Sequence, residues 1–124
     1  MNSPVSFETA KLLKEKGFDE PCSTSWETQY SKEPTITVSI TQKYRTSTHP
    51  VGKLSAPTIA EVVMWIYDKH NIWISVDRYL DPEESEDFRY GYMIYYIDDY
   101  FGRGYKTPSD SYQAGIEYAI KNLI

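Results

Sequence analysis

The side chains that could carry out chemistry in this sequence are few and widely spaced. Cys22 is the single cysteine, and the two histidines, His49 and His70, are 21 positions apart. A cysteine nucleophile needs a histidine base and a positive environment that lowers the thiol pKa. Cys22 follows Pro21 in a turn-rich segment without a helix start beside it. We therefore expect Cys22 to be a buried structural thiol, and we assign no catalytic residue.

Metal and cofactor sites are also not indicated. One cysteine allows neither an internal disulfide nor a cysteine-based zinc site within the chain. His70 is expected at a helix end, where an imidazole hydrogen-bonds the last carbonyl groups. The acidic segment 81–88 lacks the spaced oxygen ligands and the central glycine of an EF-hand. The pieces "YGY" and "GRG" do not stand between a strand and a helix start, as phosphate binding requires. We predict no metal and no cofactor.

Aromatic residues give the strongest indication of function. They form 15% of the chain, and six of the twelve tyrosines lie between Tyr90 and Tyr105. Tyrosine offers a large, rigid contact area and is enriched at recognition surfaces, although it also favours strands. Alternation along a strand sends two sets of side chains to opposite faces, so one set must point away from the helices. The candidate protein-binding residues are Trp65, Trp73, Tyr90, Tyr92, Tyr95, Tyr96 and Tyr100.

The charge pattern argues against nucleic acid as a partner. The net charge is −5, and its whole acidic excess lies in residues 63–124, mostly between Asp77 and Asp99. Nucleic-acid binding depends on a basic surface, which this pattern does not offer. The first ten residues do not resemble a signal peptide, and no apolar run is long enough to span a bilayer. We expect a cytoplasmic protein.

The elements that must position these residues can be read from caps and periodicity. Ser6 and Gly17 bracket a first helix, and the T-x-x-E spacing of Thr58 and Glu61 starts a second, which Asn71 can end. Apolar residues at helical spacing mark a closing helix. Helices are expected at about 6–16, 58–70 and 110–123, and strands at 25–30, 35–46, 72–77 and 88–100. Segments 47–57 and 101–108 are expected to be a loop and a turn, the turn with a short strand at Tyr105.

The order α-β-β-α-β-β-α predicts one α+β domain over residues 1–124. Short connections favour a two-layer sandwich, an antiparallel sheet of about four to five strands with the helices on one face. Trp65 and Trp73 are expected to lie off the main core and to be partly accessible, and Gly115 to allow a close approach of the last helix to the sheet. The residues expected to be buried between helices and sheet are Val62, Val63, Ile66, Ile116, Ala119, Ile120 and Leu123.

Four segments carry a family resemblance. They are "KEKGFDEPC" with Gly17, Phe18, Pro21 and Cys22, "APT" at 56–58, the join containing Trp65, His70, Ile72 and Ile74, and the closing helix with Gly115 and Ala119. Together they resemble a family of small proteins encoded by phages and mobile elements of Bacteroides-type gut bacteria. The resemblance implies an accessory protein in a bacterial host cytoplasm. It implies no activity and no catalytic residues.

These observations favour a non-enzymatic accessory protein that binds another protein, or a second copy of itself, through a tyrosine-rich sheet face. One alternative is a small-ligand binder or enzyme with an aromatic cleft, in which His70, Arg89 and Tyr92 converge. Another is an acidic inhibitor of a host defence or nucleic-acid-binding protein, in which the acids between Asp77 and Asp99 imitate a nucleic-acid backbone.

Overall fold

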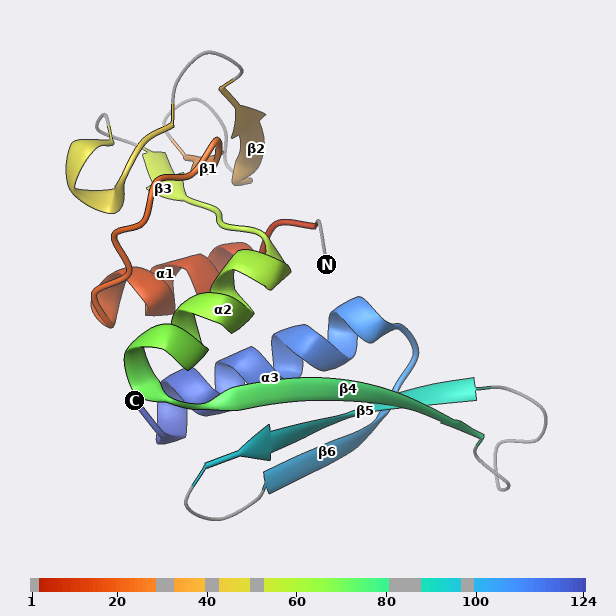
Figure 1. Cartoon of the computed structure of the whole chain (residues 1–124). Coiled ribbons are helices and arrows are strands. Elements are labelled where there is room, and N and C mark those ends of the chain that lie inside the picture. The colour runs from red at the N-terminus through yellow and green to blue at the C-terminus, as the bar shows by residue number, and fades with distance from the viewer. Residues whose placement is uncertain (1–2, 29–32, 40–42, 50–52, 81–87, 97–99) are drawn as a thin grey trace. The chain divides into compact units, whose positions relative to one another are not determined.

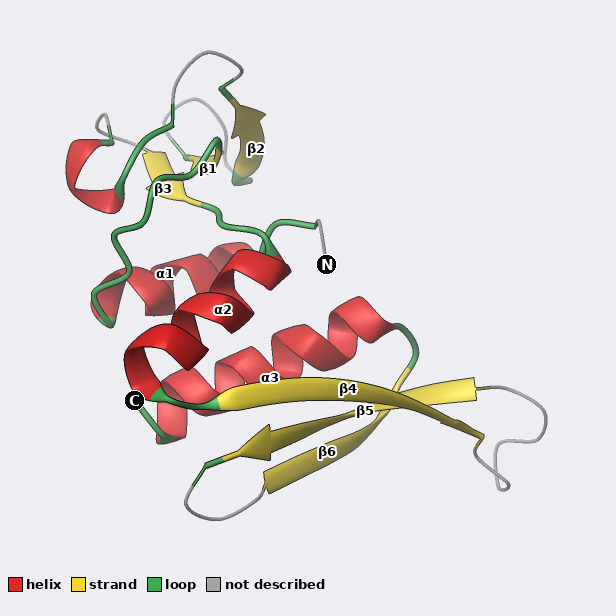
Figure 2. Cartoon of the chain, in the orientation of Figure 1, coloured by secondary structure: helices red, strands yellow, loops and turns green. Residues whose placement is uncertain are grey.

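The computed structural model (Figure 1) describes residues 3–28, 33–39, 43–49, 53–80, 88–96 and 100–124. The chain divides into two compact units, an N-terminal unit, Asn2–Thr58, and a C-terminal unit, Ile59–Ile124. The protein is α+β, as predicted, but the expectation of one sheet of four to five strands is wrong. The described strands form two separate antiparallel sheets of three strands each (Figure 2).

The N-terminal unit places one helix beside a small sheet. Its elements are α1 (Phe7–Glu15), β1 (Thr24–Glu27), β2 (Thr35–Val38), a 3-10 turn (Thr46–Thr48) and β3 (Lys53–Ser55), with strand order β2-β1-β3. The Ser6 side chain caps α1 by accepting from the Thr9 amide at 3.2 Å, and Gly17, at φ +89°, follows the helix end. Both features match the prediction.

Strand β2 carries its apolar and its hydroxyl side chains on alternate sides. Alternation puts Ile36, Val38 and Ile40 on one side of the strand. Val38 is 63% exposed, and Ile40 lies outside the described residues. Register pairs Thr37 with buried Ser25, and their hydroxyl oxygens are 2.9 Å apart. A polar cross-strand pair therefore occupies the more buried face at this position.

The C-terminal unit combines three antiparallel strands with two helices. Its elements are α2 (Ile59–His70), β4 (Trp73–Leu80), β5 (Phe88–Tyr95), β6 (Tyr100–Tyr105) and α3 (Pro108–Asn122), and the strand order is β4-β5-β6. Helix α3 packs across all three strands, and α2 packs against α3 and β4. Strand β6 occupies a segment that was expected to be mainly a turn, just as β3 occupies an expected loop.

The core of the C-terminal unit follows the predicted stripes. Val62, Val63, Ile66, Ile116, Ala119 and Ile120 are buried, whereas Leu123 is partly exposed. Asn71 takes the left-handed conformation at φ +56° and turns the chain from α2 into β4. A Cβ atom added to Gly115 would lie 3.1 Å from both Ile74 Cγ2 and Tyr92 Cγ, so α3 approaches the sheet closely there, as expected. Among the described residues, no helix is long and apolar enough to cross a membrane.

Candidate functional site

The face of the C-terminal sheet opposite α3 carries the candidate site. Ile74 and Ile94, a cross-strand pair, are buried at 1% and 0% exposure, so the alternate residues point to the other side. We call this other side the open face. It carries Trp73, Ser75, Asp77 and Tyr79 from β4, Arg89, Gly91, Met93 and Tyr95 from β5, and Phe101 and Arg103 from β6.

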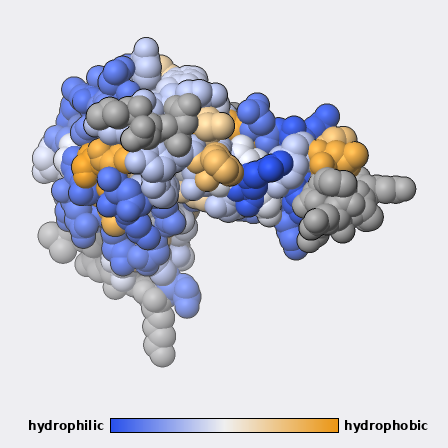
Figure 3. All heavy atoms as spheres, turned by 90° about the horizontal axis from the view of Figure 1, so that it is seen from below, coloured by the Kyte–Doolittle hydropathy of each residue, from blue (hydrophilic) through white to orange (hydrophobic). Residues whose placement is uncertain are grey.

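One end of the open face is aromatic and exposed. Trp73 is paired with Tyr95 across β4 and β5, and Met93 is paired with Phe101 across β5 and β6. Trp73 is 41% exposed, Tyr95 46% and Phe101 68%. Figure 3, viewed from below Figure 1, shows small hydrophobic groups among hydrophilic ones rather than one continuous patch. Apolar rings therefore meet water here between polar side chains, an arrangement typical of recognition surfaces.

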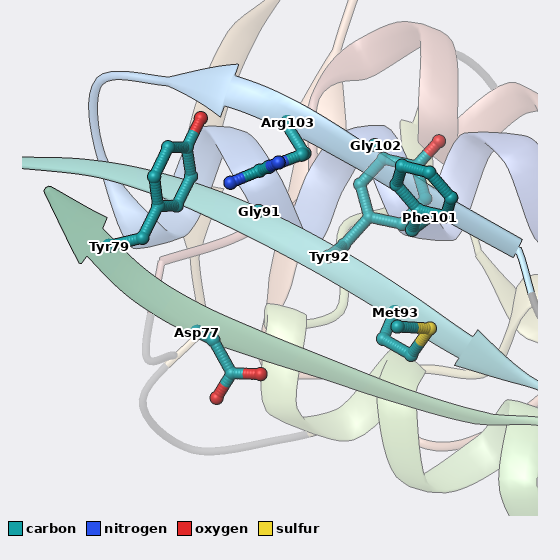
Figure 4. A pocket seen from close by; sticks show the side chains of 8 residues that line it. All are labelled: Asp77, Tyr79, Gly91, Tyr92, Met93, Phe101, Gly102 and Arg103. Carbon is teal, nitrogen blue, oxygen red and sulfur yellow. The ribbon is translucent and has the colours of Figure 1, made fainter. Parts of the chain in front are cut away.

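The other end of the open face holds a stacked arginine. The Arg103 guanidinium lies over the Tyr79 ring at 4.4 Å from its centroid, and Figure 4 shows the two side chains pointing toward each other. Tyr79 is also the direct cross-strand neighbour of Arg89. Stacking on the ring fixes the plane of the guanidinium and leaves its N–H edge available for a carboxylate.

A depression of about 370 Å³ lies between these two ends (Figure 4). Gly91 lines this depression, and a Cβ atom added there would lie 2.9 Å from the Gly102 carbonyl oxygen, so the backbone of β6 comes close to β5 at this point. The lining residues of the depression are Asp77, Tyr79, Gly91, Tyr92, Met93, Phe101, Gly102 and Arg103. The site thus presents one carboxylate and one guanidinium together with apolar and aromatic walls.

A break in strand register shapes this depression. Tyr90 pairs with Tyr105, but Tyr92 pairs with Gly102, so β6 carries one more residue than β5 between the two pairs. Gly104, at φ +93°, lies within this β-bulge and adopts a conformation that side chains rarely tolerate. The bulge places Arg103 beside Gly91, where a Cβ atom would lie 3.5 Å from Arg103 Cγ.

Several of the candidate binding residues lie elsewhere. Trp65 is only 7% exposed, so the expectation that it escapes the core is wrong, and its ring packs edge-on against His70 at 5.2 Å. Tyr92 is 9% exposed and faces α3, where burial raises the pKa of its phenol above the usual 10.0. By alternation, Tyr90 shares the α3 side with Tyr92.

The remaining candidates divide in the same way. Tyr100 stacks in a tilted arrangement on Tyr118 of α3, with ring centroids 5.1 Å apart, and is partly exposed. Tyr96 is 41% exposed and follows directly after β5. Of the seven predicted residues, the structure places Trp73 and Tyr95 on the open face.

Four open-face residues were missed by sequence reasoning, namely Tyr79, Met93, Phe101 and Arg103. Phe101 and Arg103 belong to the glycine-rich segment that was expected to turn, and glycine at 102 and 104 favoured that interpretation. The alternation of Phe101 and Arg103 with Gly102 and Gly104 was the available signal for a strand with bulky side chains on one side. Alternation along 88–100 places Met93 on the same side as Arg89 and Tyr95, which is where the structure has it.

The residues considered for nucleophilic or metal chemistry do not assemble a site. Cys22 is 2% exposed, and its thiol is 3.5 Å from the Glu20 carbonyl oxygen. His49 stacks on Tyr44 at 5.4 Å, and both its ring nitrogens are buried without a hydrogen-bond partner in the part of the chain that the structure describes. No cluster of three potential metal ligands occurs within the described ranges.

Burial sets the electrostatics of His49 as well. It lowers the pKa of the imidazole below the usual 6.5, because the cation would lose its hydration, and the positive charge of Lys53 acts in the same direction. The pKa of Asp19 is lowered by hydrogen bonds. The Ser47 amide donates to the Asp19 carboxylate at 2.8 Å, which lowers the pKa of Asp19 below 3.8. The Ser47 hydroxyl and the positive charge of Arg45 act in the same direction.

The aromatic cleft and the acidic nucleic-acid mimic were the two alternative sites. The depression on the open face includes Tyr92 but neither His70 nor Arg89, so it does not bring together the three residues named for the aromatic cleft. Most of the acids of the proposed nucleic-acid mimic, at 81–87 and 97–99, lie outside the described residues.

A second depression, of about 250 Å³ in the N-terminal unit, is lined by Phe7, Lys11, Lys14, Thr28, Lys53 and Leu54.

The open face offers contact area and charges of both signs rather than a reactive pair. Its groups can bury rings, stack on a planar group and make charge-assisted hydrogen bonds. Cys22, His49 and His70, the side chains that sequence reasoning considered for catalysis, are all absent from it. Comparisons with models of protein families, with curated proteins and with solved structures found no match.

Proposed function

We propose that this protein is a non-enzymatic binding protein that docks on another protein chain through its open face. The supporting observation is the exposure of three large rings on that face, Trp73, Tyr95 and Phe101. Each square ångström of apolar surface removed from water is worth roughly 25 cal/mol. A partner that covers these rings would therefore gain most of its affinity from them, as aromatic anchors do in known interfaces.

The charged groups of the face fit the same function. Asp77 and Arg103 flank the central depression, and both are exposed. Charges beside an aromatic patch add specificity and orientation more than affinity, because their desolvation offsets much of their attraction. A protein surface can meet both charges and rings at once.

The cellular setting is part of this proposal. We propose an accessory protein of a phage or mobile element that acts in the bacterial cytoplasm. The four family-like segments support this setting, and the single buried cysteine fits a reducing compartment.

A paired set of variants tests the binding function. Tyr95→Ser with Phe101→Ser removes two anchors from the open face, whereas Val38→Ser with Met64→Ser removes comparably exposed apolar side chains elsewhere. Tagged wild type and both variants are cross-linked in a bacterial lysate, and the protein that each one captures is compared. In a separate measurement, light scattering gives the mass of each purified protein. We expect the first pair to lose its bound protein while melting like the control pair. Equal capture by all three proteins would contradict the proposal.

A further inference from the structure

We propose that the partner of the open face is the open face of a second copy of this chain. In this dimer, related by a two-fold axis, Asp77 of each copy binds Arg103 of the other. This inference rests on the proposed function of the open face as a binding surface. It is carried by the placement of opposite charges around Gly91.

Asp77, Gly91 and Arg103 form one row across the three strands. Asp77 is the direct partner of Gly91 on β5, and Gly91 lies beside Arg103 of β6. Because glycine has no side chain, the row has a carboxylate at one end, a guanidinium at the other and the depression between them. Figure 4 shows the two charged side chains on opposite sides of this depression.

Asp77 and Arg103 have no ion partner among the described residues. Both residues are exposed, and across the described ranges neither forms an ion pair or a side-chain hydrogen bond. Arg103 is held by the Tyr79 ring, so its direction is fixed before a partner arrives. Two opposite charges without an ion partner in the described part of the chain are suited to a partner that carries the same two charges in reverse order.

The two copies of the proposed dimer are related by a two-fold axis. A two-fold interface must be self-complementary, since residue i of one copy meets residue j of the other and the reverse. Consider an axis that lies parallel to β5 between two facing sheets. It brings β4 of one copy opposite β6 of the other, so Asp77 meets Arg103 twice. An axis perpendicular to the strands would set Asp77 against Asp77, which like-charge repulsion disfavours.

The same operation covers the apolar end of the face. Phe101 of one copy lies opposite Ser75 of the other, and Met93 and Tyr95 lie opposite their own counterparts on the axis. Facing sheets pack about 10 Å apart, which leaves space for these side chains to interdigitate. Arg89 also faces its counterpart, but at the far end of the strand, where twisted sheets diverge.

Charge reversal tests this geometry directly. Asp77→Arg creates two Arg–Arg contacts in the homodimer, and Arg103→Asp creates two Asp–Asp contacts. We expect each variant alone to weaken self-association by about tenfold or more, because like charges placed face to face are strongly unfavourable. An equimolar mixture of the two variants restores both Asp–Arg contacts, so we expect a heterodimer of wild-type mass.

Sedimentation velocity on the full chain provides the readout. Lys121→Glu on α3 is the matched control and should associate like wild type, and circular dichroism confirms that each variant is folded. A wild type that stays monomeric, or a mixture that stays as monomeric as its components, would overturn the inference. Were wild type monomeric while Tyr95→Ser with Phe101→Ser still lost a captured protein, the self-pairing would fail and the binding function would stand.

Discussion

Gly102 lies directly beneath the ring of Tyr92. A Cβ atom added to Gly102 would stand 2.6 Å from Tyr92 Cζ and 2.9 Å from its hydroxyl oxygen. The ring occupies the space that a side chain at 102 would need, on the side of the sheet covered by α3. This relationship explains why Tyr92 is buried instead of contributing to the open face.

Gly102→Ala is therefore expected to destabilise the C-terminal unit. The added methyl group must push aside a buried ring that also contacts Gly115 of α3, and overpacking of this kind costs about 1–3 kcal/mol. Ser75→Ala on the open face is the control and should change the free energy of unfolding by less than about 0.5 kcal/mol. Urea denaturation measures both, and equal midpoints would contradict the packing described.

Val63→Asp tests the core between α2 and the rest of its unit. Val63 is 3% exposed, so the variant would place a carboxylate in an apolar environment without a partner. We expect a loss of several kcal/mol in the free energy of unfolding, measured by thermal or denaturant unfolding. Met64→Gln, at an exposed position of the same helix, should stay close to wild type. If the Val63→Asp protein were as stable as wild type, this face of α2 would not be part of the core.

His49 predicts a dependence of stability on pH. Its folded-state pKa lies below 6.5, so as the pH falls below 6.5 the unfolded chain takes up a proton before the folded chain does. The free energy of unfolding should therefore decrease as the pH is lowered through 6.5 toward the folded-state pKa, and it should be unaffected by His49 well above 6.5. Asp19 adds a separate loss below about 3.8, because its folded-state pKa is also lowered.

Denaturation at pH values from 8 to 5 measures the His49 contribution. His49→Gln should flatten the curve in this window. An unchanged slope in His49→Gln would show that this imidazole is not desolvated in the folded protein.

How much of this fold was predictable depends on whether the signal is local. Ser6, Gly17 and Asn71 act through their own backbone conformation, so their roles as a cap and as turn residues could be read from the sequence. Gly115 was also predictable, because a glycine beside an apolar stripe marks a close approach. The buried stripes of α2 and α3 follow from helical periodicity.

Features that depend on distant pairing were not predictable. Strand β3 spans Lys53–Ser55 and has too few residues for alternation, and it exists because β1 pairs with it. Strand β6 contains two glycines that resemble a turn, yet it pairs with β5 around a bulge. The composition of the open face was therefore not predictable either, because Phe101 and Arg103 belong to it only through the pairing of β6 with β5.

Trp73 offers an optical test of the open face. The chain has three tryptophans, of which Trp65 is 7% exposed, and the Trp26 indole donates to the Val5 carbonyl at 3.0 Å. Trp73 is 41% exposed, and its ring meets Tyr67 edge-on at 5.4 Å. Acrylamide should therefore quench a fraction of the fluorescence that comes mainly from Trp73.

Trp73→Phe should remove most of this quenchable fraction, and Trp26→Phe should retain it. Trp73 is the cross-strand neighbour of Tyr95, which lies on the axis of the proposed dimer, so quenching of wild type should decrease as the protein concentration rises through the association range. Asp77→Arg, which opposes self-pairing, should show the same quenching at every concentration. If Trp73→Phe quenched like wild type, the indole would not be accessible, and the open face would lose one of its three exposed rings.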